Sequence, residues 1–137
     1  MHYFYTKVGE AIWHLQHVEN NIAAFILIKG IAKELNSLPE SEAIKHQNRL
    51  NKLTLGQLIG ESEKFEILSE DLLLRVKSFN NERKWVVHNS VNESGHELYT
   101  DSGREYVFNK ILCFIEEAIA LNKAVESELL QYSVSKG

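Results

Sequence analysis

Residues 70–89, EDLLLRVKSFNNERKWVVHN, predict a long helix with one apolar face. At about 100° per residue, five apolar side chains of this stretch fall on one arc of the helix. These side chains are Leu72, Val76, Phe79, Val86 and Val87. Arg83 falls near the centre of the same arc, and a polar stripe lies on the opposite side. A helix of this kind buries one face against neighbours, so the stretch favours an all-α bundle.

The polar side chains of this helix suit phosphate chemistry. Histidine titrates near neutral pH, so His88 could take or give a proton. Arginine is permanently charged and its forked donors fit phosphate oxygens, so Arg83 could neutralise the phosphate that a ribose hydroxyl attacks. We therefore select Arg83 and His88 as candidate catalytic residues. The candidate substrate-binding residues around them are Lys84, Asn81, Asn80, Lys77 and Asn89.

A second interpretation of the same residues is structural. A guanidinium on an apolar arc is costly unless it is paired, and Glu10 and Glu19 are candidate partners for Arg83. His88 is then a solvated residue near a helix end. Arg83 and His88 lie roughly 140° apart around the helix, so they meet on one phosphate only through the length of the arginine or through two chains.

The spacing Arg83-x4-His88, late in a helix of a small helical chain, resembles the signature of the HEPN superfamily of nucleotide-binding-type helical domains. The resemblance implies metal-independent RNA cleavage at a composite site formed by two motifs across a homodimer. It implies that Arg83 holds the phosphate, that His88 is the general base or acid, and that Lys84 occupies the polar position after the arginine. That position is more often Asn, Asp or His in the family. Ser90 stands where relatives paired with a nucleotidyltransferase antitoxin commonly carry Tyr.

The function expected from this resemblance is an endoribonuclease with RNA as its substrate and no cofactor or metal. A toxin or phage-defence setting, with an antitoxin or defence partner protein, follows by family analogy alone. The alternative is a catalytically silent HEPN-like module for dimerisation or binding. The intact Arg83 and His88 favour the enzyme, whereas the net charge and Lys84 favour the module.

Composition is consistent with one helical domain spanning residues 1–137. The chain of 137 residues is 44% hydrophobic, which suits a globular core, and its single proline and seven glycines leave little room for the turns of an all-β fold. The net charge of −4 argues against non-specific binding of nucleic acid. RNA would therefore have to find a local positive cleft.

The single cysteine, Cys113, excludes an intramolecular disulfide and fits a reducing cytoplasm. It lies in the apolar run ILCFI, which predicts a core position. No basic segment followed by an apolar one opens the chain, so we expect no signal peptide. The longest uncharged run, residues 20–28, is far shorter than the ~18 apolar residues of a membrane span, so we expect no membrane association.

Residues 2–35 predict one long first helix. Residues 22–28 are apolar all round, which indicates that a second chain covers them or that the helix is central to its own bundle. His14 and His17, with Glu10 one turn earlier, could ligate a metal, but no further ligand pair completes the set. We interpret them as surface or cleft residues, with the alternative that this face and Asn21 look onto the Arg83 helix.

The remaining helices follow from capping patterns. Residues 36–53 predict a short basic helix or a mobile loop. Thr54 to Gln57 form a capping box that opens a helix to about Phe65, and Ser69 caps the 70–89 helix. After a turn-rich segment that contains His96, a second capping box at residues 102–105 starts a last helix to residue 132. Its predicted inward face is Val107 or Phe108, then Ile111, Leu112, Ile115, Ile119 and Val125. The predicted fold is an antiparallel up-and-down bundle of four principal helices plus one short polar helix.

Overall fold

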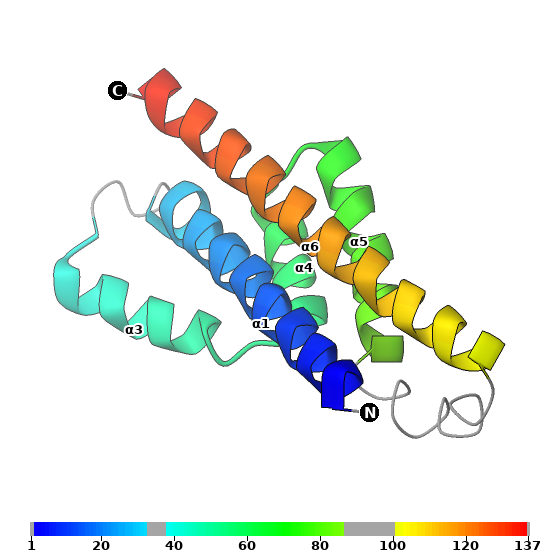
Figure 1. The fold of residues 1–137 in the computed structure, drawn as a ribbon. Helices are drawn as coiled ribbons and strands as arrows, with labels where there is room; N and C mark the ends of the chain where they lie inside the picture. The colour runs from blue at the N-terminus through cyan, green and yellow to red at the C-terminus, as the bar shows by residue number, and fades with distance from the viewer. Residues whose placement is uncertain (1, 33–37, 87–100, 137) are drawn as a thin grey trace.

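The computed structural model describes residues 2–32, 38–86 and 101–136, and every secondary-structure element within them is a helix. The elements are α1 (His2–Phe25), η1 (Ile26–Ile31), α3 (Glu40–Leu50), α4 (Leu55–Lys64), α5 (Glu70–Lys84) and α6 (Asp101–Lys136). They pack together as a bundle (Figure 1). The predicted all-α helical bundle is therefore confirmed.

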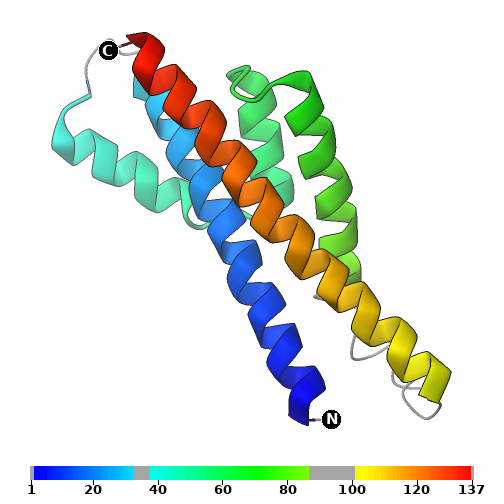
Figure 2. The same cartoon turned by 45° about the horizontal axis from the view of Figure 1, so that its top comes forward.

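The two longest helices, α1 and α6, lie side by side and run in the same direction (Figures 1 and 2). Near their N-terminal ends Tyr3 packs against Phe108, with ring centroids 5.2 Å apart. Near their C-terminal ends Phe25 packs against Tyr132, with centroids 6.5 Å apart. Contacts that advance together along both helices identify a parallel pair.

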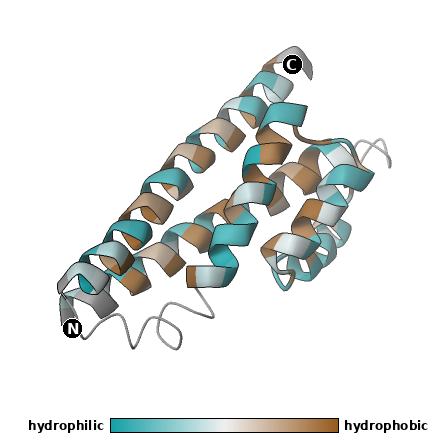
Figure 3. Ribbon diagram, turned by 90° about the vertical axis from the view of Figure 1, so that its right-hand side faces the viewer, coloured by the Kyte–Doolittle hydropathy of each residue, from teal (hydrophilic) through white to brown (hydrophobic). Residues whose placement is uncertain are grey.

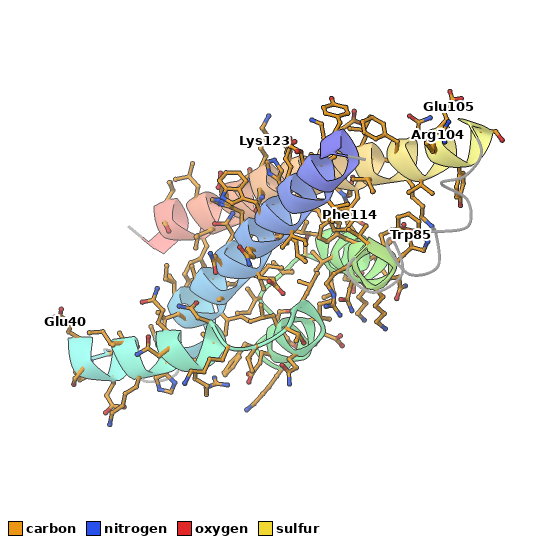
Figure 4. All side chains as sticks on the ribbon, turned by 60° about the horizontal axis from the view of Figure 1, so that its bottom comes forward. Glu40, Trp85, Arg104, Glu105, Phe114 and Lys123 are labelled. Carbon is orange, nitrogen blue, oxygen red and sulfur yellow. The ribbon has the colours of Figure 1, made fainter. Side chains whose placement is uncertain are left out.

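Helix α5 runs opposite to α6. Phe79 stacks on Phe114 with ring centroids 4.4 Å apart, and one turn earlier on α5 Arg75 pairs with Glu117 at 3.1 Å, further along α6. Trp85 and Phe114 both lie where these two helices meet (Figure 4). Stacked aromatic rings at this junction fix the register of α5 against α6.

Helix α4 runs opposite to α5 and so parallel to α1. Its first turn lies against the last turn of α5, where Gly56 faces Asn80, and its last turn is linked to the middle of α5 by an ion pair of 3.2 Å between Glu63 and Lys77. Short loops between antiparallel neighbours explain this arrangement. Directions thus alternate along the chain, with α3 as the return between α1 and α4 (Figure 1).

Residues 36–53, for which helix and loop were both open, contain helix α3. It begins after Pro39, whose missing N–H does no harm at a helix start. Only its last residue, Leu50, is buried, and Arg49 bonds Glu61 of α4 at 2.8 Å. The predicted short polar helix is therefore present, held to the bundle mainly at its C-terminal end.

The core lies between α1, α4, α5 and α6. From α5 it takes the predicted arc of Leu72, Val76 and Phe79, continued by Val86 just past the helix end. Val87 lies outside the described residues. Figure 3 shows hydrophobic and hydrophilic residues alternating around each helix, as expected of amphipathic helices in a bundle.

The capping predictions for α4 and α5 are confirmed. The Thr54 hydroxyl accepts a hydrogen bond from the Gln57 N–H, and the Gln57 side chain accepts one from the Thr54 N–H. Ser69 caps α5 by accepting from the Leu72 N–H. Glu128 of α6 accepts from both the N–H and the hydroxyl of Ser69, so the α5 cap is also a tertiary contact.

Three predictions for the last helix are wrong. Helix α6 already includes Asp101, so Ser102 is helical and lacks the extended backbone of a capping residue. Cys113 is exposed rather than buried. Ile119 is also exposed, because α6 buries Ile115 and Ala118 at that level and Ile119 falls beyond the buried arc.

The apolar run 22–28 is covered mostly by its own chain. Ile22, Phe25 and Ile26 are almost fully buried in the bundle, and only Ile28 is clearly exposed. The alternative of a helix central to its own bundle therefore accounts for this run, which no longer argues for a second chain. Past Phe25 the helix widens into the π-helical turn η1, where Gly30 packs closely against Phe65.

The helix predicted for residues 2–35 is observed as far as residue 32, and residues 33–35 lie outside the described residues. Of the helices in the described part of the chain, none combines the length and the apolar character that crossing a membrane requires.

Candidate functional site

Arg83 lies on the inner side of α5 and is half-buried between the buried residues Phe79 and Val86. Its Nε donates a hydrogen bond to Oδ1 of Asn80 at 2.9 Å. Asn80 in turn lies against the first turn of α4, where a Cβ placed on Gly56 would come within 3.5 Å of its Nδ2. Asn80 therefore holds one edge of the guanidinium, and α4 limits the movement of Asn80.

Of the two carboxylates predicted as partners of Arg83, Glu19 is the one that faces it. Burial raises the pKa of the Glu19 carboxyl, while the charge of Arg83 and the nearby Leu55 N–H act in the opposite direction. The Leu55 amide is the first of α4, so the positive end of that helix also favours the carboxylate. Glu10 is instead engaged by Lys7 at 3.0 Å.

The attraction between Glu19 and Arg83 acts without direct contact, because no ion pair to Arg83 forms among the described residues. The only hydrogen bond of its guanidinium within those residues is the one from Nε to Asn80. Toward the described residues, its two terminal nitrogens therefore have donors that are not used.

The remaining basic and amide candidates lie on the other side of α5. Lys77, Asn81 and Lys84 are exposed, as the polar stripe predicted. Lys77 is engaged by Glu63 of α4 at 3.2 Å. The structure thus brings Arg83 together with Asn80 but places the other three candidates on the outer face.

His88, Asn89 and His96 lie outside the described residues. The distance from Arg83 to His88, on which the catalytic hypothesis depends, therefore stays a prediction. Helix α5 ends at Lys84 and is followed by the π-helical pair Trp85 and Val86.

A hollow of ≈ 250 Å³ opens beside Glu19, and we call it the polar hollow. It lies between α1, the end of α3 with the turn that follows it, and α4. Its lining residues are Gln16, Glu19, Asn20, Leu50, Asn51, Leu53 and Leu58. Sequence reasoning had named only Glu19 among these, because exposed amides such as Gln16, Asn20 and Asn51 carry no distinguishing local pattern.

The alternative that His14, His17 and Asn21 look onto the Arg83 helix is wrong, and His17 is exposed, as expected of a surface residue. The Asn21 amide donates a hydrogen bond of 2.8 Å to Asn122 of α6. The two imidazoles pack around Trp13, with ring centroids 4.9 and 4.1 Å from the indole, and that indole is 56% exposed. Within residues 2–32, 38–86 and 101–136, no three His, Cys, Asp or Glu side chains gather as a metal-ligand set.

In comparisons with known proteins, the chain matches no protein-family model, no curated protein and no solved structure. The HEPN resemblance therefore depends on the motif residues themselves. The RNA cleavage and the homodimer that the resemblance implies are therefore proposals.

Proposed function

We propose that this chain is a metal-independent endoribonuclease of HEPN type that acts as a homodimer. His88 takes the proton from a ribose 2′-hydroxyl, and the resulting oxygen attacks the adjacent phosphorus. The 5′-oxygen of the next nucleotide leaves, so the product ends in a cyclic phosphate. Arg83 stabilises the negative charge that develops on the phosphate oxygens.

The observation that carries the proposal is the state of the Arg83 guanidinium. Its Nε is fixed by Asn80, whereas its terminal nitrogens have no hydrogen-bond partner among the described residues. Two parallel N–H donors with a fixed orientation match two oxygens of one phosphate. An arginine already held in place loses less side-chain entropy when it binds.

The exposed face of α5 extends this site. Lys84 and Asn81 lie there and would position the RNA backbone by phosphate and sugar contacts. Because Arg83 and this face are on different sides of α5, a second copy of the chain would bring its own α5 to the same RNA and complete the set of contacts. This requirement is the basis for proposing a homodimer.

The test is cleavage of a mixed RNA pool by the purified chain in EDTA, beside Arg83→Ala and His88→Ala. Arg75→Ala is the matched control, because Arg75 is an exposed arginine of the same helix that pairs with Glu117. The proposal expects cyclic-phosphate ends from the wild type and from Arg75→Ala, and no cleavage by the other two variants while they remain folded. Cleavage that persists in both Arg83→Ala and His88→Ala would place the active site elsewhere.

A second candidate function is a catalytically silent HEPN-like module for dimerisation or binding. The surroundings of Arg83 also fit this candidate. A half-buried arginine that bonds Asn80 and faces Glu19 is also what a structural arginine looks like. For such a residue Arg83→Ala would leave Asn80 and Glu19 without their partner and lower the free energy of unfolding by about 1–3 kcal/mol. Loss of stability in this variant, together with an inert wild type that still dimerises in sedimentation, would select the module.

A further inference from the structure

The polar hollow has the size of a single ring system. Its volume of ≈ 250 Å³ lies below the ~300–1,000 Å³ of pockets that hold drug-sized ligands. It is therefore too small for a whole nucleotide but large enough for one planar base, with the sugar and phosphate outside.

The carboxylate of Glu19 supplies an acceptor on one side of this hollow. The Leu55 N–H, in the first turn of α4, lies near enough to lower the pKa of this carboxyl. A carboxylate has about four lone-pair sites, so it can accept from two donors of one ligand. Burial raises the pKa of the Glu19 carboxyl and the positive charge of Arg83 opposes this rise. In its ionised form the carboxylate only accepts hydrogen bonds.

The other walls supply adaptable polar groups and apolar surface. The side-chain amides of Gln16, Asn20 and Asn51 make no hydrogen bonds to other described residues, and each offers both a donor and an acceptor. The apolar part of the lining is small, because Leu50 and Leu58 are almost fully buried and only Leu53 is partly exposed. A carboxylate and free amides can hydrogen-bond the edges of an unstacked base of single-stranded RNA.

We propose that the polar hollow is a recognition subsite for guanine, in which the Glu19 carboxylate accepts the N1–H and an N2 amino hydrogen of the base. Guanine is the only one of the four RNA bases with two adjacent donors on its Watson–Crick edge. Adenine and cytosine place an acceptor beside their amino group, and uracil flanks its single N–H with carbonyls. Those acceptors would face the carboxylate oxygens and repel them.

The position of the hollow relates this subsite to the proposed reaction. Glu19 lines the hollow and also lies within range of the charge of Arg83, so a base held there would be on the same side of the bundle as the phosphate that Arg83 holds. This part of the inference rests on the proposed ribonuclease function. Guanine binding itself does not depend on cleavage, so the two can fail separately.

The test measures binding of GMP, AMP, CMP and UMP to the full chain by NMR titration. We expect GMP to bind at least about 5-fold more tightly than the other three, as one good bidentate contact provides. Glu19→Gln replaces one acceptor by a donor and should abolish this preference. Glu116→Gln changes an exposed glutamate of α6 and should keep it. Equal binding of all four nucleotides, or a guanine preference unchanged in Glu19→Gln, would overturn the inference.

Two further readouts make the outcome decisive. If Glu19→Gln fails to fold, Asn20→Ala and Asn51→Ala replace it, and each should weaken GMP binding more than UMP binding. Sequencing of the cleaved ends should show guanine next to the cut in wild type. A guanine preference in binding without any cleavage would support the subsite and contradict the ribonuclease, whereas cleavage without base preference would do the reverse.

Discussion

The close contact between Gly30 and Phe65 gives a stability prediction with a defined magnitude. Gly30 is buried in the π-helical turn η1, and a Cβ added there would lie 2.8 Å from Cγ and 3.1 Å from Cβ of Phe65. Atoms at the first distance cannot coexist without movement of the ring or the turn. Gly9 also lies within a helix, but a Cβ added to it would meet nothing within 4 Å.

Two opposing effects set the size of the change. Replacing a helical glycine by alanine gains about 0.8–1.0 kcal/mol where nothing is in the way. Overpacking a filled site costs about 1–3 kcal/mol. Gly30→Ala should therefore range from neutral to about 2 kcal/mol less stable, whereas Gly9→Ala should be about 1 kcal/mol more stable. The two substitutions should thus differ by about 1–3 kcal/mol although their chemistry is identical.

The assay is urea denaturation followed by circular dichroism, with linear extrapolation to water. Phe65→Ala removes Cγ, the atom of closest approach, together with the rest of the ring. Gly30→Ala should therefore cost less in a Phe65→Ala background than in the wild type, which a double-mutant cycle reports as coupling. If Gly30→Ala stabilises the chain as much as Gly9→Ala does, the packing of η1 against Phe65 is refuted.

Three further predictions concern the core, a helix cap and a buried charge. Phe79→Ala should lower the free energy of unfolding by about 3–5 kcal/mol in urea denaturation. The control Leu74→Ala, at a side chain 65% exposed, should change it by less than about 0.5 kcal/mol. Similar values for the two variants would contradict the assignment of the inner face of α5. Thr54→Ala should remove the α4 capping box and cost about 1 kcal/mol, and an unchanged midpoint would show that this cap contributes nothing. Burial in the folded chain raises the pKa of Glu19 above its ordinary value of 4.5, so its ionised form opposes folding and stability is lost as pH rises through the folded-state pKa. Glu19→Gln should therefore raise the melting temperature at neutral pH, and this advantage should disappear below pH 4.5. A difference in melting temperature that does not depend on pH would contradict this reasoning.

Local chemistry explains why much of the bundle could be predicted. The spacing of Leu72, Val76 and Phe79 defines a helix and its buried face without reference to any other segment. Thr54 and Ser69 cap helices by bonds to amides within three residues, so their function is visible in a few letters of sequence.

The errors lie where local patterns are ambiguous. The run ILCFI is apolar throughout, but a helix can turn only part of it inward, and α6 buries Ile111, Phe114 and Ile115 while Cys113 faces out. The box at residues 102–105 has the same form as the one at Thr54, yet α6 has already begun at Asp101. Which apolar residues face inward depends on the neighbouring helices, and a short pattern does not contain that information.

The candidate site was predictable in part for the same reason. Arg83 stood out because a charge on an apolar arc demands a partner, and Glu19 was one of two carboxylates considered. The hydrogen bond from Arg83 to Asn80 is local to α5 and follows from the three-residue spacing. The polar hollow is formed by residues of three helices and the turn after α3, so no single stretch of the sequence predicts it.

The parallel pairing of α1 and α6 has a practical consequence for redesign of the chain. The first helix starts at one end of the bundle and the last helix finishes at the other, so the two ends of the described chain are far apart (Figure 2). With 36 residues, α6 is about 54 Å long. A circular permutant joining the old termini would therefore need a linker of at least about 16 extended residues. Most small domains have termini close together, so short linkers are enough for them. In this bundle a short linker would disrupt the packing of α1 against α6.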